Sequence, residues 1–101
     1  MNKMREMQLL LTKIPRGKVT SYKILAKKLK VHPRVVGRLL SKNHYPTKYP
    51  CYKVVLSSGK IGGYSSKRGV KAKIEKLESD GIIIRKNKID LKKYLFDFRK
   101  V

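Results

Sequence analysis

The chain has 101 residues, so the sequence predicts a small domain with a modest core. Its hydrophobic fraction of 41% argues against disorder, its single cysteine excludes an internal disulfide, and no apolar run approaches the roughly 20 residues that span a bilayer. A formal net charge of +21, with no Asp or Glu between Glu6 and Glu75, makes nucleic acid the expected partner rather than a membrane surface.

The N-terminal segment, residues 1–13, carries charges within its apolar run, so we interpret it as a helix and not as a signal peptide. We therefore expect the protein in the cytoplasm, associated with the nucleoid.

Three helices are predicted in the first half of the chain from apolar residues that recur every three or four positions. These residues are Met7, Leu10, Leu11 and Ile14 in the first helix, Tyr22, Leu25, Ala26 and Leu29 in the second, and Val36, Leu39, Leu40 and Asn43 in the third. Pro15 and Gly17 end the first helix, Thr20 or Ser21 caps the second, and Pro33 suits the first position of the third.

The other face of the third helix is polar and basic, and it carries Arg34, Gly37, Arg38, Ser41 and Lys42. A helix, a short turn and a second helix with a basic face form a helix-turn-helix pattern. Gly37 costs helix stability, on the order of 1 kcal/mol relative to Ala. It indicates either a close approach by the DNA backbone or a tight helix–helix contact.

The second half predicts a loop over residues 43–50, a short strand over 51–56 and a fourth helix marked by Val70, Ile74 and Leu77 and closed by Gly81. Residues 82–85 and 88–90 form a β-hairpin around 86–87, and Asp90 caps a last helix with Leu91, Tyr94, Leu95 and Phe98 on one face. The predicted fold class is mainly α, a winged helix-turn-helix DNA-binding domain with a small β-hairpin wing. We expect residues 1–101 to form a single domain.

Cys51 follows a loop with two prolines in a basic segment that includes Lys48 and Lys53. Positive charge promotes the thiolate, whereas a lone cysteine is ordinarily buried and inert, so both readings stay open at this point. With His32 and His44, Cys51 lacks the ligand number and spacing of a zinc site, and we expect no metal and no cofactor.

Several motifs follow one another in a recognisable order. They are Ile14-Pro15-Arg16-Gly17-Lys18-Val19-Thr20-Ser21-Tyr22, Arg34-Val35-Val36-Gly37, Asn43, Pro50-Cys51-Tyr52-Lys53-Val54, Gly62-Gly63-Tyr64-Ser65 and Asp80-Gly81. With these motifs the chain resembles the O6-alkylguanine-DNA alkyltransferase family over roughly residues 5–95. The resemblance covers the family's C-terminal DNA-binding and active-site domain, and we expect the family's N-terminal domain to be absent.

The resemblance implies a methylated-DNA–protein-cysteine methyltransferase that reacts once. Such a protein binds double-stranded DNA through the minor groove, flips the alkylated guanine out of the stack and keeps the alkyl group on Cys51. Arg34 would fill the gap left by the base, and Tyr22 would lie beside the flipped nucleotide, near guanine N3. Gly37, Arg38, Ser41, Lys42, Thr20 and Ser21 would complete the DNA-binding set.

The resemblance also implies a base pocket. Asn43 would hinge the helix to the active-site loop, and the carbonyls of Cys51 and Val54 would accept from the guanine amine. Ser65 would place its backbone N–H at guanine O6, and Tyr64 would belong to the same pocket unless it serves in ordinary packing.

The chain departs from the family's Pro-Cys-His-Arg-Val motif, because Tyr52 stands where the proton-relaying histidine is usual. Asp80, or alternatively Glu78, stands for the family's glutamate. A tyrosine, with an ordinary pKa near 10, is a poor base at neutral pH. Our hypothesis is that Lys53 and the basic field activate the thiol, while Tyr52 hydrogen-bonds to it or to a water.

Two other functions remain open. The alkyltransferase-like proteins are short, nonreactive lesion sensors that typically carry Trp in place of the cysteine, and a winged-helix transcription regulator would bind DNA regardless of alkylation. Some archaeal relatives carry this domain fused to endonuclease V, which the resemblance therefore implies as a fused or partner domain. We expect a monomer that does not bind membranes.

Overall fold

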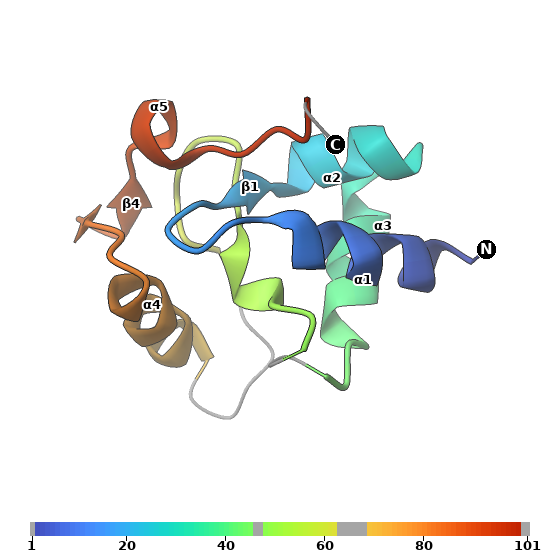
Figure 1. The fold of residues 1–101 in the computed structure, drawn as a ribbon, viewed down its shortest axis with the longest axis horizontal. Coiled ribbons are helices and arrows are strands. Elements are labelled where there is room, and N and C mark those ends of the chain that lie inside the picture. Colours follow the sequence, from blue (N-terminus) through green and yellow to red (C-terminus); the bar gives the residue numbers. More distant parts are fainter. Residues whose placement is uncertain (1, 46–47, 63–68, 100–101) are drawn as a thin grey trace.

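The computed structural model describes residues 2–45, 48–62 and 69–99. In chain order the elements are α1 (Lys3–Lys13), β1 (Thr20–Ser21), α2 (Tyr22–Leu29), α3 (Pro33–Ser41), the 3₁₀ turn η1 (Cys51–Lys53), β2 (Val54–Val55), α4 (Gly69–Ser79), β3 (Ile84–Arg85), β4 (Lys88–Ile89) and α5 (Leu91–Tyr94). Figure 1 shows α1, α2 and α3 grouped at one end, α4, the β3–β4 hairpin and α5 at the other, and η1 between them. The mainly α, helix-turn-helix prediction is confirmed.

The first three helices begin at side-chain caps. Asn2 Oδ1 accepts from the Arg5 amide at 2.8 Å, Ser21 Oγ accepts from the Ile24 amide at 3.1 Å, and His32 Nδ1 accepts from the Arg34 amide at 3.1 Å. Each cap satisfies a backbone donor that the first helical turn leaves without a partner. Of the two candidate caps of α2, Ser21 is therefore the one that acts.

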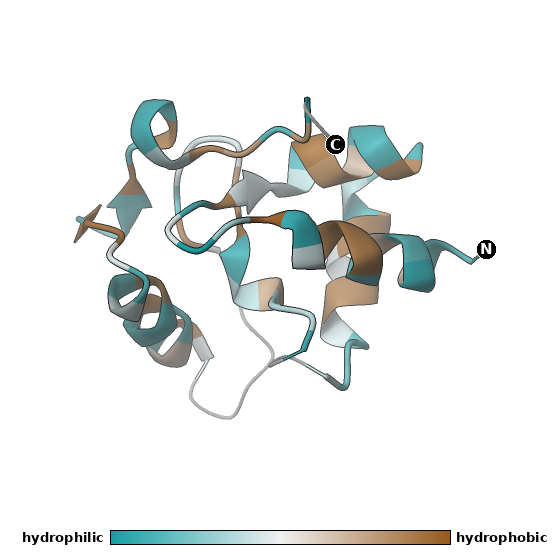
Figure 2. Cartoon of the chain, in the orientation of Figure 1, coloured by the Kyte–Doolittle hydropathy of each residue, from teal (hydrophilic) through white to brown (hydrophobic). Residues whose placement is uncertain are grey.

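The helix-turn-helix core is built from the apolar faces that the sequence predicts. α2 and α3 pack closely together, α1 contacts both, and Figure 2 shows hydrophobic faces on these three helices beside hydrophilic outer turns. The buried side chains shared by this core include Met7, Leu11, Leu25, Ala26, Leu29, Val36 and Leu40. Burial of this apolar surface holds α3 in place while its other face stays in solvent.

The two halves of the chain meet in a parallel strand pair that the sequence pattern did not predict. Thr20 pairs with Val54 and Ser21 with Val55, so the start of α2 lies beside the end of η1. The strand expected from residue 51 begins only at Val54, because Cys51–Lys53 form a 3₁₀ turn. Its amide bonds run from Lys53 to the Pro50 carbonyl at 3.2 Å and from Val54 to the Cys51 carbonyl.

A second hydrophobic cluster supports the other end of the molecule. Its buried members are Val19, Val55, Ile61, Leu77, Ile82, Ile89 and Tyr94. The predicted hairpin is confirmed, with Ile84 opposite Ile89 and Arg85 opposite Lys88.

Two predicted helical faces are wrong in part. In α4, Val70 is 40% exposed, and the buried positions are Ala72, Lys73 and Leu77. The last helix ends at Tyr94 instead of reaching Phe98, because Val19 and Leu95 form a parallel bridge in which Phe96 donates its amide to the Val19 carbonyl at 2.7 Å. Backbone pairing with the core thus replaces the helical bonds.

None of the helices in the described ranges combines the length and apolarity needed to cross a membrane.

Candidate active site

Cys51 is the first residue of η1 and its thiol is sheltered, with 6% of the side chain's surface exposed. It is a free cysteine, and it packs in the helix-turn-helix core with residues of α1, α2 and α3. Pro50 precedes it and fixes the backbone where the turn begins. The thiol therefore lies between the core formed by α1, α2 and α3 on one side and α4 on the other.

Lys73 is the cation that the sequence analysis missed at this site. It lies on the buried face of α4 with 1% of its surface exposed, and its Nζ donates to the Val54 carbonyl at 2.5 Å. Burial lowers the pKa of Lys73 to about 8, against an opposing attraction to Cys51 that raises it. The sequence offered one sign of this burial, since Lys73 occupies a position of α4 that the apolar period predicts to face the core.

The backbone carbonyls expected to meet the guanine amine already accept bonds within the protein. The Cys51 carbonyl accepts from the Val54 amide, and the Val54 carbonyl accepts from Lys73. A carbonyl oxygen has two lone pairs, so each retains one for a further donor.

Tyr22 stands at the start of α2, close to both groups. The Lys73 ammonium lies 6.0 Å from the centre of the Tyr22 ring. Burial raises the pKa of the Tyr22 hydroxyl, and the neighbouring Cys51 adds to that effect. The Tyr22 hydroxyl is therefore a protonated hydrogen-bond donor at neutral pH. The structure thus brings Cys51, Lys73 and Tyr22 together from three separate elements.

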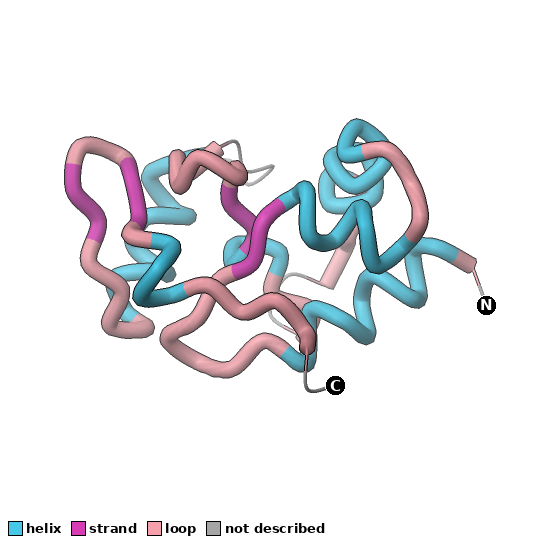
Figure 3. Tube along the Cα trace, turned by 90° about the horizontal axis from the view of Figure 1, so that it is seen from above, coloured by secondary structure: helices cyan, strands magenta, loops and turns pink. Residues whose placement is uncertain are grey.

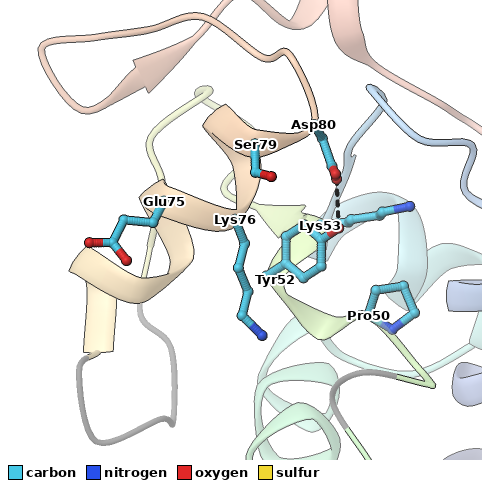
Figure 4. Close-up of a pocket in the computed structure, with 7 residues that line it drawn as sticks. All are labelled: Pro50, Tyr52, Lys53, Glu75, Lys76, Ser79 and Asp80. Carbon is cyan, nitrogen blue, oxygen red and sulfur yellow. Dashed lines mark hydrogen bonds between the residues drawn. The ribbon is translucent and has the colours of Figure 1, made fainter.

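Tyr52, which follows Cys51 in the chain, forms a pair with Asp80 (Figure 4). The Tyr52 hydroxyl donates to Asp80 Oδ2 at 2.5 Å, and Arg16 Nε lies 3.6 Å from Asp80 Oδ1. Glu78 is exposed, so Asp80 is the carboxylate that meets the residue in the histidine position. A hollow of about 460 Å³ lies between η1 and α4 around this pair.

The contacts of Lys53 differ from the activation of the Cys51 thiol that our hypothesis assigned to it. Its side chain is 7% exposed, and its Nζ donates to the Ile14 carbonyl at 3.0 Å. Burial lowers the pKa of Lys53. The Asp80 carboxylate raises this pKa, and its effect is the largest among the charged neighbours. Lys53 therefore ties η1 to the end of α1, and Lys73 is the lysine whose charge interacts with Cys51.

Asn43 links α3 to the loop before the cysteine. It is buried, its Nδ2 donates to the Tyr49 carbonyl at 2.8 Å, and its Oδ1 accepts from the Tyr45 amide at 3.2 Å. The Tyr49 hydroxyl in turn accepts from Arg5 of α1 at 2.8 Å. The loop is thereby fastened at one end to both α1 and α3.

The exposed face of α3 is the candidate nucleic-acid interface. Arg34, Arg38, Ser41 and Lys42 are all exposed on it. A Cβ added at Gly37 would meet no atom of the described residues within 4 Å, which argues against a tight helix–helix contact as the reason for this glycine. The open space beside Gly37 leaves room for an external partner.

Thr20 and Ser21 lie beneath the surface, at 0% and 3% exposure. Ser21 caps α2, and Thr20 Oγ1 has no hydrogen-bond partner among the described residues. The structure therefore gives these two side chains places in the fold and not on the exposed α3 face. Tyr64 and Ser65 lie outside the described residues.

No cluster of three or more His, Cys, Asp or Glu side chains that could hold a metal ion occurs among residues 2–45, 48–62 and 69–99.

A helix-turn-helix unit with an exposed basic recognition helix and a sheltered thiol beside it defines a DNA-binding domain with a candidate nucleophile. Residues 3–82 match the family model described as "6-O-methylguanine DNA methyltransferase, DNA binding domain". The chain belongs to this family.

Two relatives and two solved structures illustrate the family. The chain is 46% identical over 90 residues to a bifunctional methyltransferase/endonuclease of Picrophilus torridus, covering 87% of this chain and 30% of that protein. It is 50% identical over 72 residues to a methylated-DNA–protein-cysteine methyltransferase of Saccharolobus solfataricus, covering 71% of this chain and 46% of that protein. It thus spans less than half the length of these curated relatives.

Among solved structures, S. pombe Atl1 in complex with damaged DNA containing O6-carboxymethylguanine superimposes with a TM-score of 0.83 at 25% identity, covering 93% of this chain and 94% of that one. The O6-methylguanine-DNA methyltransferase of Pyrococcus kodakaraensis superimposes with a TM-score of 0.73 at 36% identity, covering 81% of this chain and 47% of that one.

Proposed function

We propose that this protein binds double-stranded DNA at O6-alkylated guanine and transfers the alkyl group to the sulfur of Cys51. The observation that carries the proposal is the sheltered Cys51 thiol, which interacts with the Lys73 ammonium and lies behind the exposed basic face of α3. Family membership and the named activity of the S. solfataricus relative support it.

In the proposed reaction the Cys51 proton leaves to solvent and the thiolate attacks the alkyl carbon. A carbon–sulfur bond forms, the bond from that carbon to guanine O6 breaks, and its electron pair stays on the guanine. The Lys73 ammonium interacts electrostatically with Cys51 and attracts the negative charge of the attacking sulfur. Tyr22, which is protonated at neutral pH, donates a hydrogen bond to the departing base.

Tyr52 is assigned a positioning role instead of the relay of the usual histidine. Its hydroxyl proton already points to Asp80, and a phenol is a weak base near neutral pH. The Tyr52–Asp80 bond joins η1 to the end of α4, the helix that carries Lys73. The pair therefore maintains the distance between the thiol and its cation.

The DNA product provides the test of this function. The protein would be mixed in a series of molar ratios with a duplex that contains one O6-methylguanine, and the nucleosides would be quantified after digestion. We expect O6-methylguanine to be converted to guanine, one lesion per protein molecule, and Cys51→Ala to convert none. Repeated conversion by one molecule, or conversion by Cys51→Ala, would refute direct transfer to this cysteine.

A nonreactive lesion sensor is the second candidate function. The likeness to S. pombe Atl1 over nearly the whole of both chains favours it, as does the absence of the usual histidine. It predicts tighter binding to the damaged duplex without conversion of the base. A transcription regulator, by contrast, would bind methylated and unmethylated duplexes equally.

The P. torridus relative is named as both methyltransferase and endonuclease. We therefore keep endonuclease V, as a fused or separate domain, as the proposed partner. Co-purification of the two proteins on a DNA-free column would test this partnership.

A further inference from the structure

We infer that the β3–β4 hairpin and Lys60 form a second DNA-binding surface, which holds phosphates of the duplex that flanks the α3 site. The inference rests on the DNA binding proposed for this protein and is independent of alkyl transfer. It assigns a partner to a group of cations that the proposed active site does not use.

The cations stand side by side on neighbouring backbone segments. Arg85 and Lys88 are directly opposite each other in the hairpin, and Lys60 forms an antiparallel bridge with Lys88. The bonds from the Ile61 amide to the Asn87 carbonyl, 3.1 Å, and from the Ile89 amide to the Gly59 carbonyl, 2.9 Å, fasten these segments together. Directly paired residues point to the same face, so Lys60, Arg85 and Lys88 form one row.

This small ribbon has an apolar and a basic face. Ile61 and Ile89, each next to a member of the row, are 2% and 4% exposed and pack in the second hydrophobic cluster. Because side chains alternate along a strand, Lys60, Arg85 and Lys88 face solvent, and all three are exposed. Within the described part of the chain, no salt bridge involves any of them.

The arrangement is costly for folding. Like charges directly opposite each other destabilise a strand pair. Lys86 and Asn87, the two turn residues, have φ of 52° and 59°, a left-handed conformation that glycine and asparagine adopt readily and that costs a lysine about 1 kcal/mol. Three cations of one hairpin with Lys60 beside them, without a compensating ion pair among the described residues, point to an anionic partner.

The hairpin and α3 face the same side of the molecule. α3 lies on the far side in Figure 1, and in Figure 3 the hairpin turn and α3 both lie along the upper edge, with the loop over residues 56–62 between them. The longest axis of the molecule is 36 Å, which corresponds to roughly ten base pairs at 3.4 Å each. One straight duplex can therefore reach both surfaces, which identifies the occupant as the phosphate backbone of the same DNA.

The test compares two double variants that lose the same charge. Lys86→Gln with Lys88→Gln removes two cations of the hairpin. Lys13→Gln with Lys28→Gln removes two exposed cations that belong to α1 and α2 and not to α3 or the hairpin. Binding to an undamaged duplex would be measured by fluorescence anisotropy over a salt series from about 50 to 200 mM.

We expect the slope of log affinity against log salt to become shallower by about 2 in the hairpin variant, since each phosphate contact contributes about 0.9, and to stay near the wild-type value in the control. Lys60→Gln with Arg85→Gln should repeat the result. Shortening one arm of the duplex to about three base pairs should abolish the difference between hairpin variant and wild type, whereas shortening the other arm should preserve it.

This inference would be overturned if the hairpin variant and the wild type had equal salt slopes. It would also be overturned if the slope became shallower by the same amount in the hairpin and control variants. A difference that survives shortening of both arms would overturn it as well. A wild-type affinity that does not change with salt would instead contradict the proposed DNA binding itself. A failure of this inference can therefore be distinguished from a failure of the proposed function.

Discussion

The hydroxyl of Tyr52, the residue that stands where the family's histidine is usual, donates a hydrogen bond of 2.5 Å to Oδ2 of Asp80. The proton of Tyr52 is therefore directed away from the neighbouring thiol. The same carboxylate lies 3.6 Å from Arg16. The pair joins η1 to the end of α4 without supplying a base, and Lys73 is the lysine that interacts electrostatically with Cys51.

Replacing Tyr52 by Phe separates positioning from proton relay. We expect Tyr52→Phe to lower the free energy of unfolding by about 2 kcal/mol, since hydrogen bonds to charged groups contribute about 1.5–3 kcal/mol. Methyl transfer should fall by less than tenfold, because no proton passes through the hydroxyl. Urea unfolding and single-turnover transfer kinetics would measure the two effects, with Arg16→Gln as the control for the other partner of Asp80. A thousandfold loss of rate with unchanged stability would show that Tyr52 is a relay.

Replacing Lys73 by Met should have opposite effects on stability and reaction. With a pKa of about 8 against an ordinary 10.5, the buried ammonium costs on the order of 3 kcal/mol near neutral pH, part of which the bond to Val54 offsets. Lys73→Met should therefore unfold at a higher urea concentration near pH 7, while its methyl transfer should be slower than that of the wild type, because the cation that interacts with Cys51 is lost.

The change of folding stability with pH tests whether this cost comes from the charge on Lys73. Between about pH 8 and 10.5 the unfolded state keeps the Lys73 proton and the folded state does not, so wild-type stability rises with pH over this window. The advantage of Lys73→Met over the wild type should shrink across it. Parallel stability curves for the two proteins would contradict the assignment.

Replacing Gly37 by Ala should stabilise the protein and weaken DNA binding. The added Cβ meets no atom within 4 Å, so the helix gains about 1 kcal/mol without a clash inside the protein. The methyl group would instead occupy the space where the DNA backbone approaches α3. Thermal unfolding and duplex affinity would be measured on the same samples, and equal or tighter DNA binding would place the duplex elsewhere.

Replacing Asn43 by Ala tests the anchoring of the active-site loop. The change leaves the Tyr49 carbonyl and the Tyr45 amide without their partner, which should cost about 1–3 kcal/mol and slow methyl transfer. Gln8→Ala is the matched control, because Gln8 makes only a 3.5 Å contact to Asn43 and should have little effect. If both variants behave alike in unfolding and transfer, Asn43 is not the anchor.

The helices and the hairpin could be predicted because their signals are local. The apolar period of Leu25, Leu29, Val36 and Leu40, the cap at Ser21 and the turn at 86–87 each act over a few residues, and the structure confirms them. The last helix was extended too far because its period continues to Phe98. The long-range bond from Phe96 to Val19 ends it earlier.

The decisive parts of the site depend on contacts distant in sequence. Lys73 is buried because α4 packs against η1, and its Nζ donates a hydrogen bond to the carbonyl of Val54 in β2. No spacing rule connects residues 73 and 54. The parallel pairing of β1 with β2 involves two residues per strand, too few for an alternating pattern. Sequence alone therefore favoured Lys53, the nearest cation along the chain, over Lys73.

The mass of the intact protein after incubation with a duplex that carries one O6-methylguanine tests the central claim most directly. The account predicts that the wild-type protein gains the mass of one methylene group and no more, that Cys51→Ser gains none, and that the gain lies in the peptide containing Cys51. An unchanged wild-type mass, in a sample that binds the damaged duplex more tightly than the undamaged one, would contradict alkyl transfer and identify the protein as a lesion sensor.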